Sequence, residues 1–173
     1  EEEKAKHLLP ARPVIAANNA PTTPLSIFVG KKLQQLLYLT ADKKLGNKET
    51  TIIVVEDSFS VARIIDVFNK QPSEDPISII TFDITNLYPT FKTNELLDNT
   101  KTAMQWLNWP AVEQSTVMIL LHAVLANNYL YAGNQQQVYL QRDGIATGSN
   151  LATQLANLTL LVYEIKGLES LPK

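Results

Sequence analysis

Cysteine is absent from this chain of 173 residues, which excludes a disulfide framework and thiolate metal sites. No apolar run approaches the roughly 20 residues of a membrane-spanning helix, and no signal peptide opens the sequence. The chain also has no large excess of positive or negative charge, because it contains 15 Lys and Arg and 17 Asp and Glu. Bulk charge therefore indicates no nucleic-acid partner, and any basic track must be local.

What the chain does contain is apolar material: 45% of residues are hydrophobic and only 18% are charged, which predicts a folded domain with a real core. The sequence starts abruptly with "EEEKAK" and stops with "GLESLPK" just after an apolar helix. We therefore expect it to be cut from a longer protein at both ends.

Periodicity and capping residues predict a mixed order of helices and strands. The expected fold class is α+β, with a small antiparallel sheet and helices packed on one of its faces. The Gly133-Asn134 turn signal favours a β-hairpin. The first expected helix begins at Thr23 or Ser26 and ends before Gly46. The other expected helices cover 58–69, 93–108, 111–127 and 150–166, and the expected strands cover 14–17, 77–84, 129–131 and 137–141.

One acid interrupts an otherwise apolar segment, "SIITFDITNLYPTF". Asp83 lies near the end of the strand expected at 77–84, where a buried carboxylate is costly unless it is paired or bound to metal. Mg²⁺ prefers oxygen ligands and often takes only one or two protein carboxylates. Asp83 is thus either a Mg²⁺ ligand or a cap for the turn that follows it.

An aromatic residue, Tyr88, follows five positions after this acid. It can return over the same place and form a wall of the site. Alternatively, it is an ordinary half-buried tyrosine.

The glycine-rich segment "QRDGIATGSNLATQLANL" opens the last expected helix. Gly144 and Gly148 allow a turn and a close approach by a ligand, and Ser149 or Asn150 can cap the helix. The small residues Gly148, Ala152 and Ala156 give the helix a flat face for a base or another backbone. No Gly-Lys-Ser/Thr follows, so this is not a phosphate P-loop. The alternative is a flexible turn that joins a hairpin to a core helix.

Lysines and tryptophans offer weaker signals for nucleic acid. Lys31, Lys32, Lys43 and Lys44 either contact a phosphate backbone or form a solvated helix face. Trp106 and Trp109 either stack on bases or pack the end of a helix.

The two segments together resemble motifs A and B of reverse transcriptases, and the likeness is nearest to Penelope-like retroelement polymerases, a group similar to telomerase. "FDITNLYPTF" matches the Asp-x-x-x-Leu-Tyr motif A. "YLYAGNQQQVYLQRDGIATGSNLATQLANL" matches an aromatic hairpin followed by Gly-x-x-x-Gly-Ser-x-Leu-Ala-x-x-x-Ala-Asn-Leu. "ARPVIAANNAPTTPLSIF" resembles the family's upstream strand and proline-containing helix, so the likeness covers nearly the whole chain.

The resemblance implies a polymerase palm and fingers fold, with 1–50 as a fingers-like segment and 51–173 as a palm segment. It implies that Asp83 and the backbone carbonyl of Ile84 hold catalytic Mg²⁺ (or Mn²⁺), and that Tyr88 is the steric gate that excludes a ribose 2′-hydroxyl. Gln141, Gly148 and Ser149 resemble the platform under the incoming nucleotide and the template base.

Arg12 resembles the fingers arginine that reaches the triphosphate, and its bidentate fork suits phosphate. It can equally be a surface arginine before a proline. The partners that the resemblance implies are an RNA template, a DNA primer and deoxynucleoside triphosphates, with no membrane.

Two departures limit what this chain is expected to do alone. Asn150 and Thr153 stand where motif B usually carries prolines, and motif C, which supplies the second metal-binding Asp, is missing. One carboxylate cannot hold two metals, so we expect residues 1–173 alone not to polymerise. The alternatives are a non-catalytic nucleic-acid-binding or scaffolding module derived from such an enzyme, and an α+β interaction domain whose motif match is chance. Exposed apolar surface is expected to allow self-association.

Overall fold

The computed structural model describes residues 20–45, 58–70, 81–131 and 138–170. The strand expected at 14–17, the first part of the strand expected at 77–84, and Arg12 lie outside the described residues. The elements, in chain order, are α1 (Thr23–Leu45), α2 (Ser58–Lys70), α3 (Leu87–Thr90), α4 (Thr93–Trp106), α5 (Ala111–Ala126), β1 (Tyr129–Tyr131), β2 (Val138–Leu140) and α6 (Ala152–Glu169).

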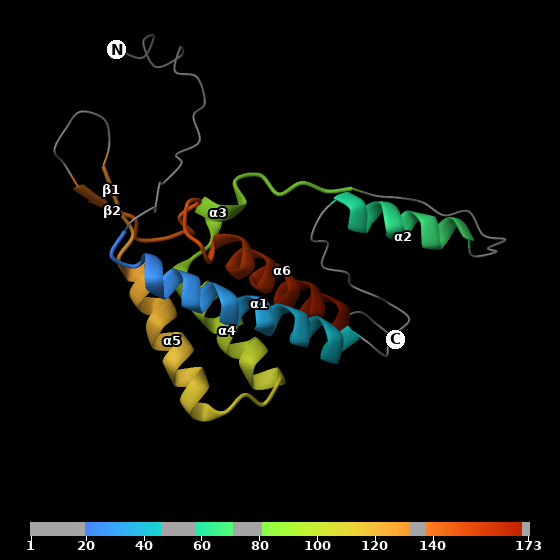
Figure 1. Ribbon diagram of the computed structural model, residues 1–173, viewed down its shortest axis with the longest axis horizontal. Coiled ribbons are helices and arrows are strands. Elements are labelled where there is room, and N and C mark those ends of the chain that lie inside the picture. The colour runs from blue at the N-terminus through green and yellow to red at the C-terminus, as the bar shows by residue number, and fades with distance from the viewer. Residues whose placement is uncertain (1–19, 46–57, 71–80, 132–137, 171–173) are drawn as a thin grey trace, which may run out of the picture.

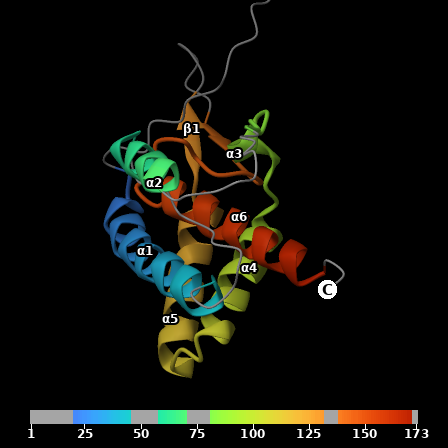
Figure 2. The same cartoon turned by 90° about the vertical axis from the view of Figure 1, so that its right-hand side faces the viewer.

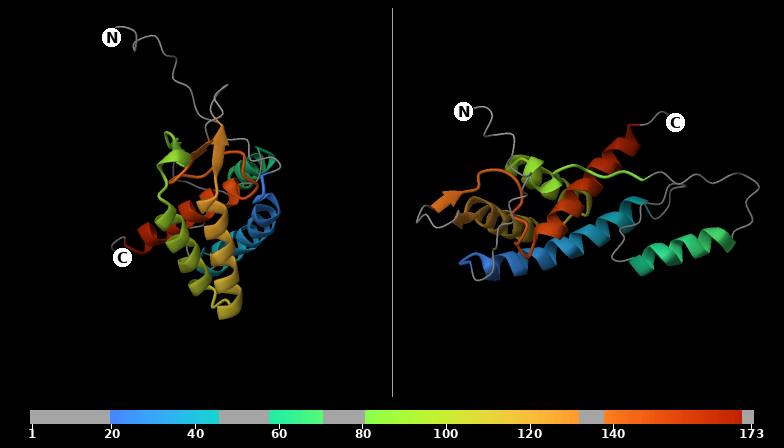
Figure 3. Two further views of the ribbon diagram at one scale, coloured as in Figure 1. Left: turned by 90° about the vertical axis from the view of Figure 1, so that its left-hand side faces the viewer. Right: turned by 90° about the horizontal axis from the view of Figure 1, so that it is seen from above.

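Helices α1, α4, α5 and α6 pack on one another and form the body of the molecule (Figure 1). Helix α6 packs on α1 and α4, and α5 packs on the same two helices. Figure 2 and the left panel of Figure 3 show this group from its two sides, with α1 and α6 running alongside each other. The helix predictions for these segments are confirmed, although α6 begins and ends slightly later than expected.

The core lies between these helices and is built almost wholly of aliphatic side chains. The buried residues of α1 recur every three or four positions, which places them on one side of that helix, whereas the buried residues of α6 surround most of it. Complete burial of a leucine contributes about 1.5–3 kcal/mol relative to leaving it exposed. The residues with no exposed surface include Val29, Leu33, Leu36, Leu96, Ala103, Met104, Leu121, Leu155, Leu158 and Val162.

Glycine lets α1 approach the start of α6 closely. A Cβ atom on Gly30 would lie 3.1 Å from the carbonyl oxygen of Asn150 and 3.4 Å from the Cα of Leu151. Ala152 and Ala156 are buried in the same core. The two alanines of the small-residue face that was expected to receive a base or a backbone therefore lie in the protein interior and are not open to a base, whereas Gly148 is half-buried.

The turn between α4 and α5 ends the first helix sharply, as "NWP" predicts. Asn108 has a φ of 53°, in the left-handed region that asparagine tolerates better than most residues. The Trp109 N–H then donates to the Met104 carbonyl at 3.1 Å, which satisfies one of the unpaired carbonyls at the helix end.

The hairpin is confirmed, with β1 and β2 antiparallel and Leu130 opposite Tyr139. This two-stranded sheet supports an α+β class only loosely, because the described chain is mostly helical. The expectation that helices pack on one face of a sheet is wrong for the described residues: the helices bury their apolar sides against each other. A sheet with three residues in each strand offers too little surface to cover such a core.

The strand expected at 77–84 is not found in its described part. Residues 81–84 are neither helix nor strand, and the Phe82 side chain is 90% exposed. An apolar run predicts a strand covered on both faces only where neighbouring strands exist, and no described strand pairs with this segment.

Helix α2 was expected from its apolar periodicity, and it is confirmed. It is not among the closely packed helices and lies apart from them in the figures (Figure 1, and right panel of Figure 3). Phe59 and Val67 are 76% and 56% exposed. No helix in the described parts of the chain has the length and apolar character needed to span a membrane.

Candidate functional site

The segment that resembles motif A forms a tight turn followed by one helical turn. Asn86 adopts a left-handed conformation with φ 55°, and α3 follows it. Leu87 and Tyr88 are half-buried and pack against the core, whereas Asp83 and Ile84 are exposed. The chain therefore turns inward at Tyr88, which anchors an otherwise exposed segment.

The segment that resembles the start of motif B lies directly on α3. The Ile145 N–H donates to the Tyr88 carbonyl at 2.9 Å, and the Gly144 N–H donates to the Phe91 carbonyl at 2.8 Å. These carbonyls belong to the end of a short helix and lack partners within it. Two parts of the chain more than 50 residues apart are thus joined by backbone hydrogen bonds.

Gly144 is the residue that allows this contact. Its φ is +84°, and a Cβ atom there would lie 2.9 Å from the Tyr88 carbonyl oxygen and 3.1 Å from the Cα of Pro89. Both the backbone conformation and the lack of space require glycine. Gly144, Ile145 and Ala146 are all buried, so this turn is fixed in place.

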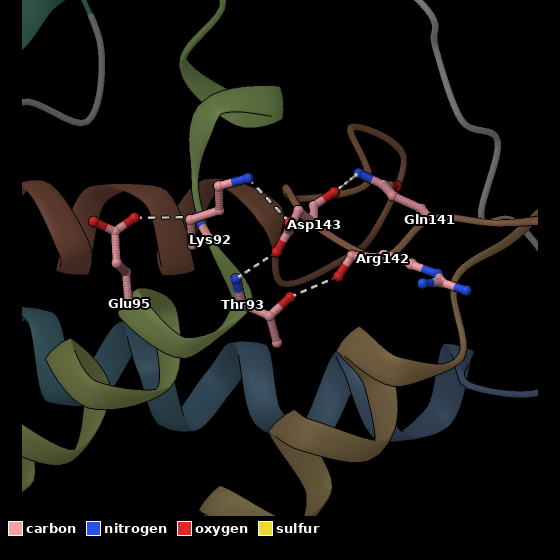
Figure 4. A network of polar contacts seen from close by, with 6 residues as sticks. All are labelled: Lys92, Thr93, Glu95, Gln141, Arg142 and Asp143. Carbon is pink, nitrogen blue, oxygen red and sulfur yellow. Dashed lines mark hydrogen bonds and ion pairs between the residues drawn. The ribbon is translucent and has the colours of Figure 1, made fainter.

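Polar side chains surround the same junction (Figure 4). The Asp143 carboxylate accepts hydrogen bonds from the Lys92 ammonium at 3.1 Å and from the Thr93 backbone N–H at 3.2 Å. The Thr93 hydroxyl donates to the Arg142 carbonyl at 3.0 Å. Asp143 therefore caps the first turn of α4 from a distant part of the chain, and the glycine-rich loop is tied to α4 as well as to α3.

Electrostatics favour the charged form of Asp143. The hydrogen bond from Lys92, followed by that from the Thr93 N–H, holds the pKa of the Asp143 carboxyl below its ordinary value of 3.8. On the opposite side of the same helix start, the Glu95 carboxylate accepts the Lys92 backbone N–H at 3.1 Å. Two carboxylates thus satisfy amides at the start of α4.

Gln141, expected in a nucleotide platform, makes contacts within its own loop. Its Nε2 donates to the Asp143 carbonyl at 2.9 Å, and its backbone N–H donates to the Asn128 carbonyl at 2.9 Å, which prolongs the hairpin ladder. Its Oε1 is buried and has no hydrogen-bond partner among the described residues. Gln141 is therefore occupied mainly within its own loop.

Gly148 and Ser149 are half-buried at the other end of the loop. The neighbouring Asn150 donates from Nδ2 to the Ser26 Oγ at 3.4 Å, and its carbonyl lies against Gly30. The expectation that Ser149 or Asn150 caps the last helix is wrong. Helix α6 begins at Ala152, and no side chain caps it, because the loop closes through a backbone bond from Ala152 to the Ser149 carbonyl.

Asp83 is not buried in a strand, which removes the expected desolvation cost, and no described residue forms an ion pair with it. A free, exposed carboxylate next to the carbonyl of Ile84 suits a single metal ligand. Within the described ranges, however, no three His, Cys, Asp or Glu side chains lie together as a metal site. The described residues therefore do not form a two-metal centre by themselves.

Two of the four α1 lysines form ion pairs with residues of other helices. Lys32 pairs with Glu113 at 3.5 Å and lies 5.8 Å from the Trp109 ring centroid. Lys44 pairs with Glu169 at 3.0 Å and lies 4.4 Å from the Trp106 ring centroid. Both tryptophans pack against the core, so their contacts favour a structural role over base stacking.

Sequence reasoning missed Lys92, Thr93 and Asp143. The Asp143-Gly144 dipeptide is a turn signal, but it does not reveal which helix the turn meets. Glu95, three residues after Lys92 at a helix start, was a signal for the local bond at α4. Comparison with known proteins adds nothing to this description, since no protein-family model, curated protein or solved structure matches the chain.

Proposed function

We propose that this chain is the fingers and palm core of an RNA-directed DNA polymerase. The reaction is template-directed transfer of deoxynucleotides to a DNA primer on an RNA template. The observation that supports this best is the 2.9 Å hydrogen bond from the Ile145 N–H to the Tyr88 carbonyl. It joins the two segments that resemble motifs A and B, which a polymerase site needs side by side.

In this proposal the exposed Asp83 carboxylate and the Ile84 carbonyl are metal ligands, and Tyr88 contacts the sugar of the incoming nucleotide. The Tyr88 side chain packs against the core, and its backbone carbonyl accepts a hydrogen bond from the 141–145 turn. A ring fixed in this way can exclude a 2′-hydroxyl by steric contact, because it cannot easily move aside.

Gln141, Gly148 and Ser149 form the proposed surface under the incoming nucleotide and the template base. Gln141 fixes the loop through its bond to the Asp143 carbonyl, and Gly148 and Ser149 are half-buried beyond it. Arg12 is the proposed triphosphate contact and lies outside the described residues.

The proposed cofactor is Mg²⁺ or Mn²⁺, which would activate the primer 3′-hydroxyl and neutralise the leaving pyrophosphate. Asp83 supplies one carboxylate, and a second has to come from residues that the structure does not describe or from a longer form of the protein. Activity is therefore proposed for the complete enzyme rather than for this chain alone.

The lack of a carboxylate cluster among the described residues favours a second candidate function. In this alternative the chain is a non-catalytic module that binds or scaffolds nucleic acid. It would hold a template and primer without extending the primer.

Primer extension on an RNA template separates these proposals, with deoxy- and ribonucleotides assayed in parallel. The protein to use is the longest natural form that contains these residues. We expect extension with deoxynucleotides, its loss in Asp83→Asn, and acceptance of ribonucleotides by Tyr88→Val, because removal of the ring removes the steric barrier. Asp42→Asn, the same change at an exposed position near the end of α1, is the matched control and should extend normally.

Retained extension by a folded Asp83→Asn protein would remove this residue from the site. An unchanged sugar preference in Tyr88→Val would count against the gate. Binding of the template and primer with no extension by the unmodified protein would favour the non-catalytic module.

A further inference from the structure

The turn formed by Gln141–Ile145 holds the backbone of α3 in one position. Ile145 and Gly144 donate hydrogen bonds to the carbonyls of Tyr88 and Phe91, at 2.9 and 2.8 Å. Because a helix as short as α3 cannot satisfy these carbonyls itself, its shape depends on the turn that contacts it.

The contact leaves no room for adjustment at Gly144. A Cβ atom there would meet the Tyr88 carbonyl oxygen at 2.9 Å, the Gln141 Nε2 at 3.0 Å and the Cα of Pro89 at 3.1 Å. Two of these three neighbours are backbone atoms of α3, which cannot rotate away. Any side chain at this position must push α3 outward or change the φ of +84°.

The turn is itself fastened on its other side. Gln141 donates to the Asp143 carbonyl, and the Asp143 carboxylate is bound by Lys92 and by the Thr93 N–H. Asp143 thus ties the turn to the start of α4 (Figure 4). A shift at the contact between Gly144 and Tyr88 therefore falls mainly on α3.

We infer that Gly144 is a positioning residue for Tyr88 and thereby sets the discrimination between deoxyribose and ribose substrates. The inference rests on the proposed function, since it takes Tyr88 as the residue that contacts the sugar. Gly144 touches no substrate, and it acts through the carbonyl and the backbone of α3. The Tyr88 ring excludes a 2′-hydroxyl only while α3 holds it close to the nucleotide.

The test is the ratio of kcat/KM for a deoxynucleotide to that for the matching ribonucleotide, measured by primer extension with the longest natural form of the protein. Gly144→Ala should lower this ratio by about tenfold or more, because displacement of a positioned group by about 1 Å has effects of this size. Gly167→Ala is the matched control: the same change in α6 meets no atom within 4 Å, so the ratio should stay unchanged.

Asp143→Ala is a second variant for the case in which Gly144→Ala does not fold. It releases the turn from Lys92 and Thr93 without adding a clash, and it should lower the same ratio by a smaller factor. Hydrogen exchange of the Ile145 amide gives a parallel measurement, and exchange should be faster in both variants.

The outcomes separate this inference from the proposed function. A wild-type protein that extends no primer overturns both. A wild-type protein that is active and selective, with folded variants that keep its sugar ratio, overturns the role of Gly144 alone. Equal loss of activity for the two sugars also overturns it, because that is the result of a purely structural role.

Discussion

Large apolar side chains are buried in one region of this protein and exposed in another. In the packed group of α1, α4, α5 and α6, Leu36 and Leu158 have no exposed surface. In α2 and the segment before α3, Phe59 and Phe82 are 76% and 90% exposed. Apolar character alone therefore does not decide burial, because a side chain is buried only where a second element covers it.

The difference also separates stability from interaction. The packed helices supply the hydrophobic stabilisation of the fold, whereas large exposed apolar side chains are typical of contact surfaces. Self-association is expected where such side chains are exposed, which includes Val112 and Ile119 of α5, at 79% and 67%, as well as the second region. Sedimentation velocity over a range of protein concentrations measures it, and a monomer at every concentration would contradict it.

The largest effect is expected from a cavity in the packed region. Leu158→Ala should lower the free energy of unfolding by about 2–5 kcal/mol, since it removes buried methyl groups and leaves a cavity. Phe59→Ala removes a larger side chain from an exposed position of α2 and should change the free energy of unfolding by no more than about 0.5 kcal/mol. Urea unfolding followed by circular dichroism measures both values. Similar losses for the two variants would show that α2 is as well packed as the core, which would contradict the difference between the two regions.

A second, smaller effect concerns how closely α1 and α6 approach. Gly30→Ala places a Cβ atom 3.1 Å from the Asn150 carbonyl oxygen, and overpacking of this kind costs about 1–3 kcal/mol. Gly167→Ala has open space around it and should stabilise by about 0.5–1 kcal/mol through helix propensity. Because both variants gain in propensity, their difference in thermal unfolding isolates the contact. Equal unfolding temperatures would mean that the Asn150 backbone moves aside.

The smallest effect is expected at the exposed junction of the glycine-rich loop with α4. The pKa of Asp143 is lowered in the folded protein, first by the Lys92 hydrogen bond. The ionised carboxylate therefore contributes its stabilisation in full above its ordinary pKa of 3.8, and the contribution is lost as the pH falls through the lowered value. Asp143→Asn should unfold at a slightly lower urea concentration than wild type at neutral pH, and the difference should shrink as the pH falls below 3.8. A difference that is independent of pH would exclude the charge as its cause.

The sequence by itself determined where most helices lie. The spacing of Leu33, Leu36 and Leu37 marks the buried side of α1, although Ile27 and Phe28, which were assigned to the same face, are 44% and 45% exposed. "NWP" ends α4, because this signal is local and depends on residues within one turn. The Gly133-Asn134 signal likewise predicted the hairpin. The motif-like residues Asp83, Tyr88 and Gly148 were identified from the same local patterns.

Only the tertiary structure decided which of these segments meet and which side chains are covered. Residues 81–84 have the apolar pattern of a buried strand, yet no described strand pairs with them and they are exposed. Asp143 reaches the start of α4 across 50 positions, and Gly144 packs on Tyr88. Such contacts depend on how all the helices pack together, and no short stretch of sequence contains that information.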